Sequence, residues 1–239
     1  MIIATSITQP YLEKSKPFFE SVVKHFNGKR ICFCIGFNCE IEGWETVNVP
    51  IESLQIKWQP SNRDGYYSLQ HGEFTRHYDF KPDDVIMFCD SDMVLQRYWV
   101  GLRTYPSTFY LTNSSFPPTY ICNVIENIGC TYPDLIMREY DIDYKETELC
   151  TCFMIADIKS WKLLYKRVKI RKGFLRHFNH HATWQLLISI LIKATFNHEV
   201  LSPVICCADW YSGTPAKYVG DKLTIGGTDV YFNHTKFKK

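Results

Sequence analysis

The sequence has no hydrophobic run that is long enough to cross a membrane. Its longest apolar stretch, residues 186–192, is interrupted by Ser189 and falls far short of the roughly 20 residues that a transmembrane helix needs. The first residues read directly as a strand and lack the basic and apolar regions of a secretory signal peptide. We therefore expect a protein without a membrane span that is located in the cytoplasm.

Cys-x-x-Cys pairs are also absent, although the chain has 10 cysteines. Neither a zinc site nor a thioredoxin-like site is therefore supported. Most of the cysteines lie inside apolar runs, where a free cysteine acts as a small hydrophobic residue. This set comprises Cys32, Cys34, Cys89, Cys150, Cys152, Cys206 and Cys207. We expect them to be reduced core residues, as is usual in cytoplasmic proteins.

The chain carries little net charge, with a formal value of +2. A charge this small predicts no strong attraction to nucleic acid or to anionic lipid. Basic residues nevertheless cluster in residues 159–176 and again in the tail, at Lys236, Lys238 and Lys239. The first cluster is typical of a solvated helix face, or of a rim that attracts an anionic substrate.

The composition indicates a packed globular protein. Hydrophobic residues make up 46% and aromatic residues 15% of the 239 positions, which excludes a disordered or fibrous chain. No internal repeat, low-complexity tract or long linker divides the sequence. The length fits one domain, so we expect residues 1–239 to fold as a single unit.

Apolar runs alternate with helical patterns in the first part of the chain. We expect strands at residues 2–7, 30–36, 45–49 and 85–89, with helices at 12–26 and 66–78. This β-α-β rhythm predicts parallel strands with right-handed crossovers. Further along, we expect strands at 108–112, 150–158 and 200–207, helices at 160–167 and 180–195, and a terminal strand or docked tail at 230–232. Residues 113–143 are expected to be irregular with short helical turns, and residues 213–227 to form a loop. The fold class is therefore α/β, with a mixed, mostly parallel sheet flanked by helices.

The strand at residues 85–89 ends in an acidic tip, Asp90-Ser91-Asp92. Its five apolar residues show no helical stripe, which is typical of a strand buried on both faces of a parallel sheet. Ligands of open α/β sheets bind beyond the carboxyl ends of the strands. Two carboxylates there can turn towards one hard cation such as Mg²⁺ or Mn²⁺, which completes its shell with water and phosphate. An ordinary acidic turn would give the same three residues.

Three segments together resemble the GT-A fold of nucleotide-sugar-dependent glycosyltransferases. Ala4-Thr5-Ser6 leading into Gln9-Pro10-Tyr11 is similar to the nucleotide-contacting edge of glycogenin-like enzymes. Met87 to Asp92 is similar to the apolar strand and Asp-x-Asp metal motif of the family. Phe232-Asn233-His234-Thr235-Lys236 resembles the segment that supplies a histidine ligand and a lysine. The compact chain also resembles small viral or bacterial transferases of this fold.

The resemblance implies a Rossmann-type GT-A sheet and a set of roles for individual residues. It implies that residues 1–112 form a nucleotide-binding half, and that residues 113–239 form an acceptor-side half with a metal-contacting tail. The divalent ion, Mn²⁺ or Mg²⁺, would be held by Asp90, Asp92 and His234. The donor, a nucleoside-diphosphate sugar with a UDP-sugar favoured, would contact Thr5, Ser6, Tyr11, Ser91 and Lys236.

Other residues have the right chemistry for the donor or for catalysis. Arg63 and Arg76 precede the acidic tip, and each guanidinium could bind a diphosphate. Asp209, Glu148 and His181 are candidate bases for deprotonating an acceptor hydroxyl, which an inverting enzyme requires and a retaining enzyme does not. The acceptor would be a glycan, a glycoprotein or another hydroxyl compound, and the enzyme a hexosyl- or pentosyltransferase.

Two further functions fit parts of the pattern. A nucleotidyltransferase also combines a Rossmann-like sheet with metal-binding carboxylates, but it normally has a glycine-rich phosphate loop after the first strand. Residues 7–11 contain no glycine. A non-catalytic carbohydrate- or protein-binding domain would use Asp90 and Asp92 only to end a strand. Metal-dependent nucleotide binding separates this third function from the other two.

Overall fold

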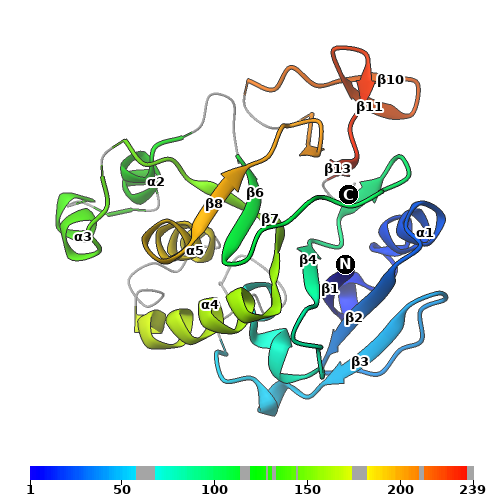
Figure 1. Ribbon diagram of the computed structural model, residues 1–239, viewed down its shortest axis with the longest axis horizontal. Coiled ribbons are helices and arrows are strands. Elements are labelled where there is room, and N and C mark those ends of the chain that lie inside the picture. Colours follow the sequence, from blue (N-terminus) through cyan, green and yellow to red (C-terminus); the bar gives the residue numbers. More distant parts are fainter. Residues whose placement is uncertain are drawn as a thin grey trace.

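A seven-stranded sheet forms the centre of the molecule (Figure 1). The computed structural model describes residues 1–57, 68–113, 119–127, 129–130, 133–143, 145–173, 182–209 and 213–235. The strand order is β3 (Glu45–Val49), β2 (Lys29–Ile35), β1 (Ile2–Thr8), β4 (Val85–Cys89), β7 (Leu149–Asp157), β6 (Thr108–Asn113) and β8 (Asn197–Val200). The first four of these are mutually parallel, and β7 runs antiparallel to both β4 and β6. The α/β class is thus confirmed.

Alternate residues of each central strand enter two different cores, one on either face of the sheet. In β1, Ile2 and Ala4 join the core that contains Trp161, whereas Ile3 and Ile7 join the opposite core. The first core is covered by α4 (Ile158–Arg171) and α5 (Ala182–Thr195), and the second by α1 (Lys16–His25). Because both faces are covered, the central strands carry apolar residues on both sides, as their sequences predicted.

The first helix begins later than its apolar pattern predicted. Residues 9–11 form a short 3₁₀ turn, and α1 starts only at Lys16, with Pro17 in its first turn. Proline is favoured there because its missing N–H would have no intrahelical partner. The apolar side of the helix then packs as expected, with the rings of Phe18 and Phe19 lying 5.5 and 5.2 Å from that of Trp44.

Residues 66–78 do not form the expected helix in the part that the structure describes. Two 3₁₀ segments, η3 (Ser68–His71) and η4 (Glu73–Arg76), are separated by Gly72, whose φ is +98°. A β-carbon at Gly72 would lie 2.6 Å from the carbonyl oxygen of Trp161, so the close approach of α4 also requires glycine. The left-handed glycine is what ends the helical pattern here.

The last part of the chain is more ordered than its turn-rich sequence indicated. Residues 213–227 were expected to be irregular, but β10 (Lys217–Val219), β11 (Lys222–Ile225) and β12 (Thr228–Asp229) form an antiparallel sheet. The expected strand at 200–207 is divided between the end of β8 and β9 (Cys206–Cys207). Residues 113–143, which were expected to be irregular with short helical turns, contain two short helices in their described part, α2 (Ile121–Asn127) and α3 (Pro133–Glu139).

A third, small sheet joins the end of the chain to its middle. β13 (Phe232–His234) lies between β5 (Met93–Leu95), to which it is antiparallel, and β9, to which it is parallel. Its Phe232 is fully buried and packs on Phe153, with 4.9 Å between the ring centroids. Among the described helices, none is both long enough and apolar enough to span a bilayer.

Candidate functional site

The acidic tip lies at the carboxyl end of β4, in the middle of the central sheet. The backbone N–H of Asp90 donates to the carbonyl of Cys152 at 2.8 Å, which extends the β4–β7 pairing by one residue. After this bond the chain leaves the ladder, and Ser91 and Asp92 form a turn into β5. The side chains of Asp90 and Asp92 are partly buried. This is the edge at which open α/β sheets bind ligands.

The β5–β13 pairing brings the end of the chain to these carboxylates. His234 lies opposite Met93 in the ladder, and both the N–H and the hydroxyl of Thr235 donate to the Asp92 carbonyl, at 2.9 and 2.8 Å. As a result, Nε2 of His234 lies 3.1 Å from Oδ1 of Asp92. One potential ligand atom from each of Asp90, Asp92 and His234 lies within 4.8 Å of the others.

The charge of His234 is controlled by this acidic pair. Burial by itself lowers the pKa of the ring, but the carboxylates of Asp92 and Asp90 outweigh it and raise the pKa to about 9. The imidazole is therefore a cation at neutral pH when only the two carboxylates face it. A divalent cation in the same place would be favoured by the carboxylates and would displace the ring proton.

Gln96 fixes the segment that carries His234, and sequence reasoning missed it. Its amide nitrogen donates to the carbonyls of Leu223 and Val230 at 2.9 and 2.8 Å, and its amide oxygen accepts from the Leu223 N–H at 2.8 Å. Its own N–H donates to the Tyr231 carbonyl at 2.8 Å. One buried residue thus joins the end of β5 to β11 and to the segment just before β13. A lone glutamine after a short apolar run gives no sequence signal for such a role.

Two of the residues expected to contact the nucleotide, Thr5 and Ser6, lie beside the acidic tip. Ala4 pairs with Phe88 in the sheet, so Thr5 and Ser6 lie level with the last residue of β4 and with Asp90. The Thr5 hydroxyl is fully buried and has no hydrogen-bond partner among the described residues. Tyr11 is partly buried on the 3₁₀ turn that follows β1.

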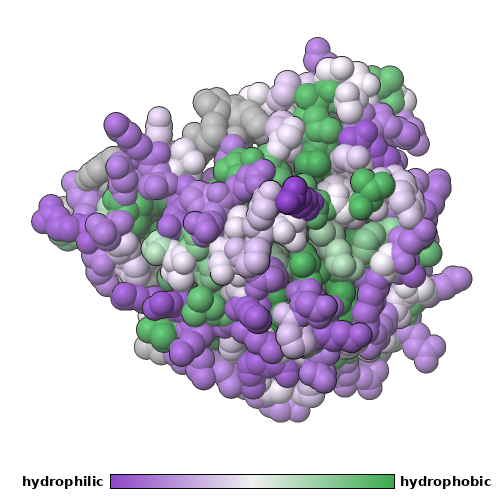
Figure 2. All heavy atoms as spheres, in the orientation of Figure 1, coloured by the Kyte–Doolittle hydropathy of each residue, from purple (hydrophilic) through white to green (hydrophobic). Residues whose placement is uncertain are grey.

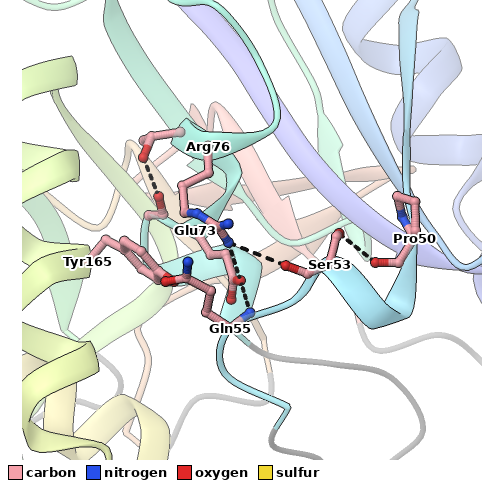
Figure 3. Close-up of polar contacts among 8 residues, drawn as sticks. Pro50, Ser53, Gln55, Glu73, Arg76 and Tyr165 are labelled. Carbon is pink, nitrogen blue, oxygen red and sulfur yellow. Dashed lines mark hydrogen bonds and ion pairs between the residues drawn. The ribbon is translucent and has the colours of Figure 1, made fainter.

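Ser91 and Arg76 are both engaged within the protein. The Ser91 hydroxyl accepts a hydrogen bond from Ser15, just before α1, at 2.9 Å. Arg76 pairs with the fully buried Glu73 at 3.2 Å and donates to the Ser53 carbonyl at 3.4 Å (Figure 3). Glu73 in turn accepts the Gln55 N–H at 2.5 Å. These bonds tie Ser91 to α1 and Arg76 to the segment after β3, and their contacts to a donor stay predictions.

Two of the expected bases lie next to strand ends at the same edge, Asp209 after β9 and Glu148 before β7. β9 runs parallel to β13, and Cys207 lies opposite Asn233. Asp209, two residues further on, is therefore in register with Thr235, and it is exposed. Glu148 precedes β7, beyond the residue that pairs with Asp90, and is 5% exposed. His181, Arg63 and Lys236 fall outside the described residues.

Comparison with known proteins identifies the architecture. No family model matches the sequence, and no curated protein matches it. Two crystal structures of the galactosyltransferase LgtC do match, one in complex with donor and acceptor sugar analogs and the other of an active-site mutant. Each match covers 98% of this chain and 87% of LgtC with a TM-score of 0.61, at 8% and 7% sequence identity.

The chain has the GT-A fold. The fold that the three segments implied is therefore confirmed, over almost the whole described molecule. At 7–8% identity the likeness does not extend to individual residues. Asp90, Asp92 and His234 lie close together in this structure, but their roles as metal ligands, and the division at residue 112, stay predictions.

Proposed function

We propose that this GT-A protein is a metal-dependent glycosyltransferase that takes its sugar from a nucleoside-diphosphate donor, with a UDP-sugar favoured. The proposal rests on one observation, the cluster of Asp90, Asp92 and His234 at the carboxyl end of the central strand. The likeness to LgtC, which was solved with donor and acceptor sugar analogs, supports the same class of reaction.

The donor set fits Mn²⁺ or Mg²⁺. Carboxylate oxygens suit hard divalent cations, and a neutral imidazole is accepted by Mn²⁺ in particular. When bound, such an ion stabilises the negative charge that develops on the leaving diphosphate. Asp90 and Asp92 would supply the negative charge that holds the cation, and His234 would supply a nitrogen ligand from β13. Thr235 and Gln96 keep His234 in place through the bonds described above.

The edge of β1 would bind the nucleoside. Thr5 offers a buried hydroxyl without a described partner, Ser6 lies next to it, and Tyr11 offers an aromatic face to the base. We assign Ser91, Arg63, Arg76 and Lys236 to the donor phosphates and ribose. Ser91 would act from the turn that links Asp90 to Asp92, and Arg76 would do so while paired with Glu73.

The acceptor would enter on the side where Asp209 and Glu148 lie. We propose Asp209, Glu148 and His181 as the groups that orient or deprotonate the acceptor hydroxyl, with a carbohydrate or glycoprotein as the acceptor. Asp209 is the exposed member of the three within the described residues, so it is best placed to meet a large acceptor.

The test is the binding of UDP with and without Mn²⁺, measured by titration calorimetry. We expect wild-type protein to bind UDP tightly only when Mn²⁺ is present, and Asp92→Asn to lose this dependence while its circular dichroism stays unchanged. Asp83→Asn is the matched control, because Asp83 lies in the exposed turn before β4. Equal UDP affinity in wild type and Asp92→Asn would refute the metal site. Release of pyrophosphate from a nucleoside triphosphate would instead indicate a nucleotidyltransferase.

A further inference from the structure

One side of α4 is basic and is not used by the proposed reaction. Trp161, Leu164 and Val168 bury the opposite side of this helix in the core. The outward side consists of exposed lysines, an arginine and two aliphatic residues, and residues 158–171 contain no acidic residue. We call this surface the α4 basic face; its members are Lys159, Lys162, Leu163, Lys166, Arg167, Lys169 and Ile170.

The helical repeat places the two aliphatic residues in the middle of this face. Lys159, Leu163, Lys166 and Ile170 follow one another at steps of three or four residues, so they form a single stripe along the helix. Lys162 and Lys169 flank this stripe on one side, and Arg167 flanks it on the other. The side chains of Leu163 and Ile170 are exposed, at 40% and 65%, and neither contributes to the core.

The cations of this face have no acidic partner in the described part of the chain. Ion pairs there involve Lys16, Lys29, Arg76, Lys193, Lys222 and His234, and none of these belongs to α4. Figure 2 shows small hydrophobic patches among hydrophilic side chains in the region where Figure 1 draws α4. The face therefore combines uncompensated positive charge with exposed aliphatic groups.

We propose that the α4 basic face docks the protein on an anionic phospholipid surface. Lysine and arginine ammonium and guanidinium groups attract anionic headgroups, and Leu163 and Ile170 can enter the boundary between headgroups and acyl chains. A nucleic acid is a poorer partner, because aliphatic groups occupy the centre of the face and it presents no aromatic side chain for a base.

This docking surface goes beyond the proposed transfer reaction and does not depend on it. The net charge of +2 for the whole chain argues against attraction to lipid. The charges are unevenly distributed, however, because α4 contains lysines and arginines and no acidic residue. In Figure 1, α4 lies well apart from β13, which carries His234, so docking through α4 leaves the candidate metal cluster away from the bilayer contact.

The test is co-sedimentation of the full chain with two kinds of vesicle in moderate salt. One consists of phosphatidylcholine alone, and the other contains roughly 30% phosphatidylglycerol, which gives the bilayer a negative surface potential. We expect binding to the anionic vesicles only. Each basic residue near such a surface contributes roughly a fivefold factor. Lys159→Glu/Lys166→Glu should therefore weaken binding by more than about 25-fold. Leu163→Ser/Ile170→Ser should weaken it several-fold.

Lys24→Glu/Lys81→Glu is the matched control, since it changes the net charge equally at exposed positions outside α4. We expect it to bind anionic vesicles as wild type does. The proposal is overturned if wild type does not sediment with anionic vesicles, if the α4 charge variant still does, or if the control loses binding equally. It is also overturned if a single-stranded oligonucleotide binds wild type more tightly than the vesicles do and the α4 charge variant loses that binding.

Discussion

His234 has an environment in which a proton and a metal ion compete. An ordinary histidine, with a pKa of roughly 6.5, would already be neutral at pH 7.5. Here, against the effect of burial, Asp92 and Asp90 raise the pKa to about 9. Since the protonated ring cannot coordinate, we expect Mn²⁺ affinity without nucleotide to rise about tenfold per unit between pH 6.5 and 8.5. Titration with Mn²⁺ at several pH values measures this slope.

His234→Gln is the control for this pH dependence, because it keeps Asp90 and Asp92 and removes the titrating group. We expect its Mn²⁺ affinity to be weaker and nearly constant over the same pH range. The same raised pKa implies that protonated His234 stabilises the metal-free fold fully below about pH 6.5 and that this contribution is lost as the pH rises through about 9. Wild-type affinity that is equal at pH 6.5 and 8.5 would show that His234 is not a ligand.

Tyr11 gives a second prediction at the scale of one residue. Stacking of a base on an aromatic ring contributes roughly 1–3 kcal/mol in nucleic-acid complexes. We expect Tyr11→Ala to weaken UDP binding in the presence of Mn²⁺ by about 5- to 150-fold, and to leave Mn²⁺ affinity without nucleotide unchanged. Tyr98→Ala is the control, because Tyr98 is exposed next to the last turn of α1. Unchanged UDP affinity in Tyr11→Ala would place the base elsewhere.

At the scale of elements, the candidate site depends on how β13 is held. Gln96 bonds the backbone on both sides of the β11–β12 turn, and it directly follows β5, the strand that pairs with β13. In Gln96→Ala, the Leu223 N–H and the Val230 carbonyl lose this partner, whereas the Leu223 carbonyl still accepts from the Val230 N–H at 2.9 Å. Unsatisfied buried groups of this kind cost about 1–3 kcal/mol each. We expect a lower free energy of unfolding together with weaker Mn²⁺ binding, measured by denaturant titration and calorimetry.

Ser189→Ala is the comparison for Gln96→Ala. Ser189 bonds the N–H and carbonyl of Leu149 at 3.0 and 3.2 Å, between α5 and β7, and has no described bond to β13. We expect Ser189→Ala to lower the free energy of unfolding without changing Mn²⁺ affinity. If Gln96→Ala also left Mn²⁺ affinity unchanged, the Gln96 bonds would serve stability alone.

Central strands with almost complete burial are among the elements that the sequence predicted well. The apolar runs of β1, β2 and β4 are buried on both faces, so their composition alone indicates central strands. The helix predicted at residues 66–78 was wrong because the helical spacing of the apolar residues does not indicate the left-handed conformation of Gly72. The loop predicted at residues 213–227 was wrong because a short hairpin with few buried side chains has the same turn-rich composition as a loop.

At the scale of the whole molecule, the site joins residues from the middle and the end of the chain. The bond from Thr235 to Asp92 spans 143 positions. Asp90 and Asp92 could be singled out locally, because a buried strand ends at them. His234 could be proposed only through the resemblance, since its approach depends on pairing between β5 and β13. Gln96 could not be found at all, because its partners are backbone groups of β11 and of the segment before β13.

The GT-A topology explains why these distant segments meet. β4 ends in the middle of the sheet, and β5 then turns back to pair with β13 above the core that contains Phe153 and Phe232. The carboxyl ends of the parallel strands and the end of the chain are thereby collected at one edge. A donor bound there would contact β1, the acidic tip and β13 together.

The most direct measurement is the release of UDP from a panel of UDP-sugars, with and without Mn²⁺. The account predicts that wild-type protein hydrolyses or transfers at least one of these sugars only when Mn²⁺ is present. Asp92→Asn should reduce this rate by at least about 100-fold, as expected when a charge-stabilising group is lost at the reacting centre, and Asp83→Asn should not. Turnover that is independent of the metal, or undiminished in Asp92→Asn, would contradict the account.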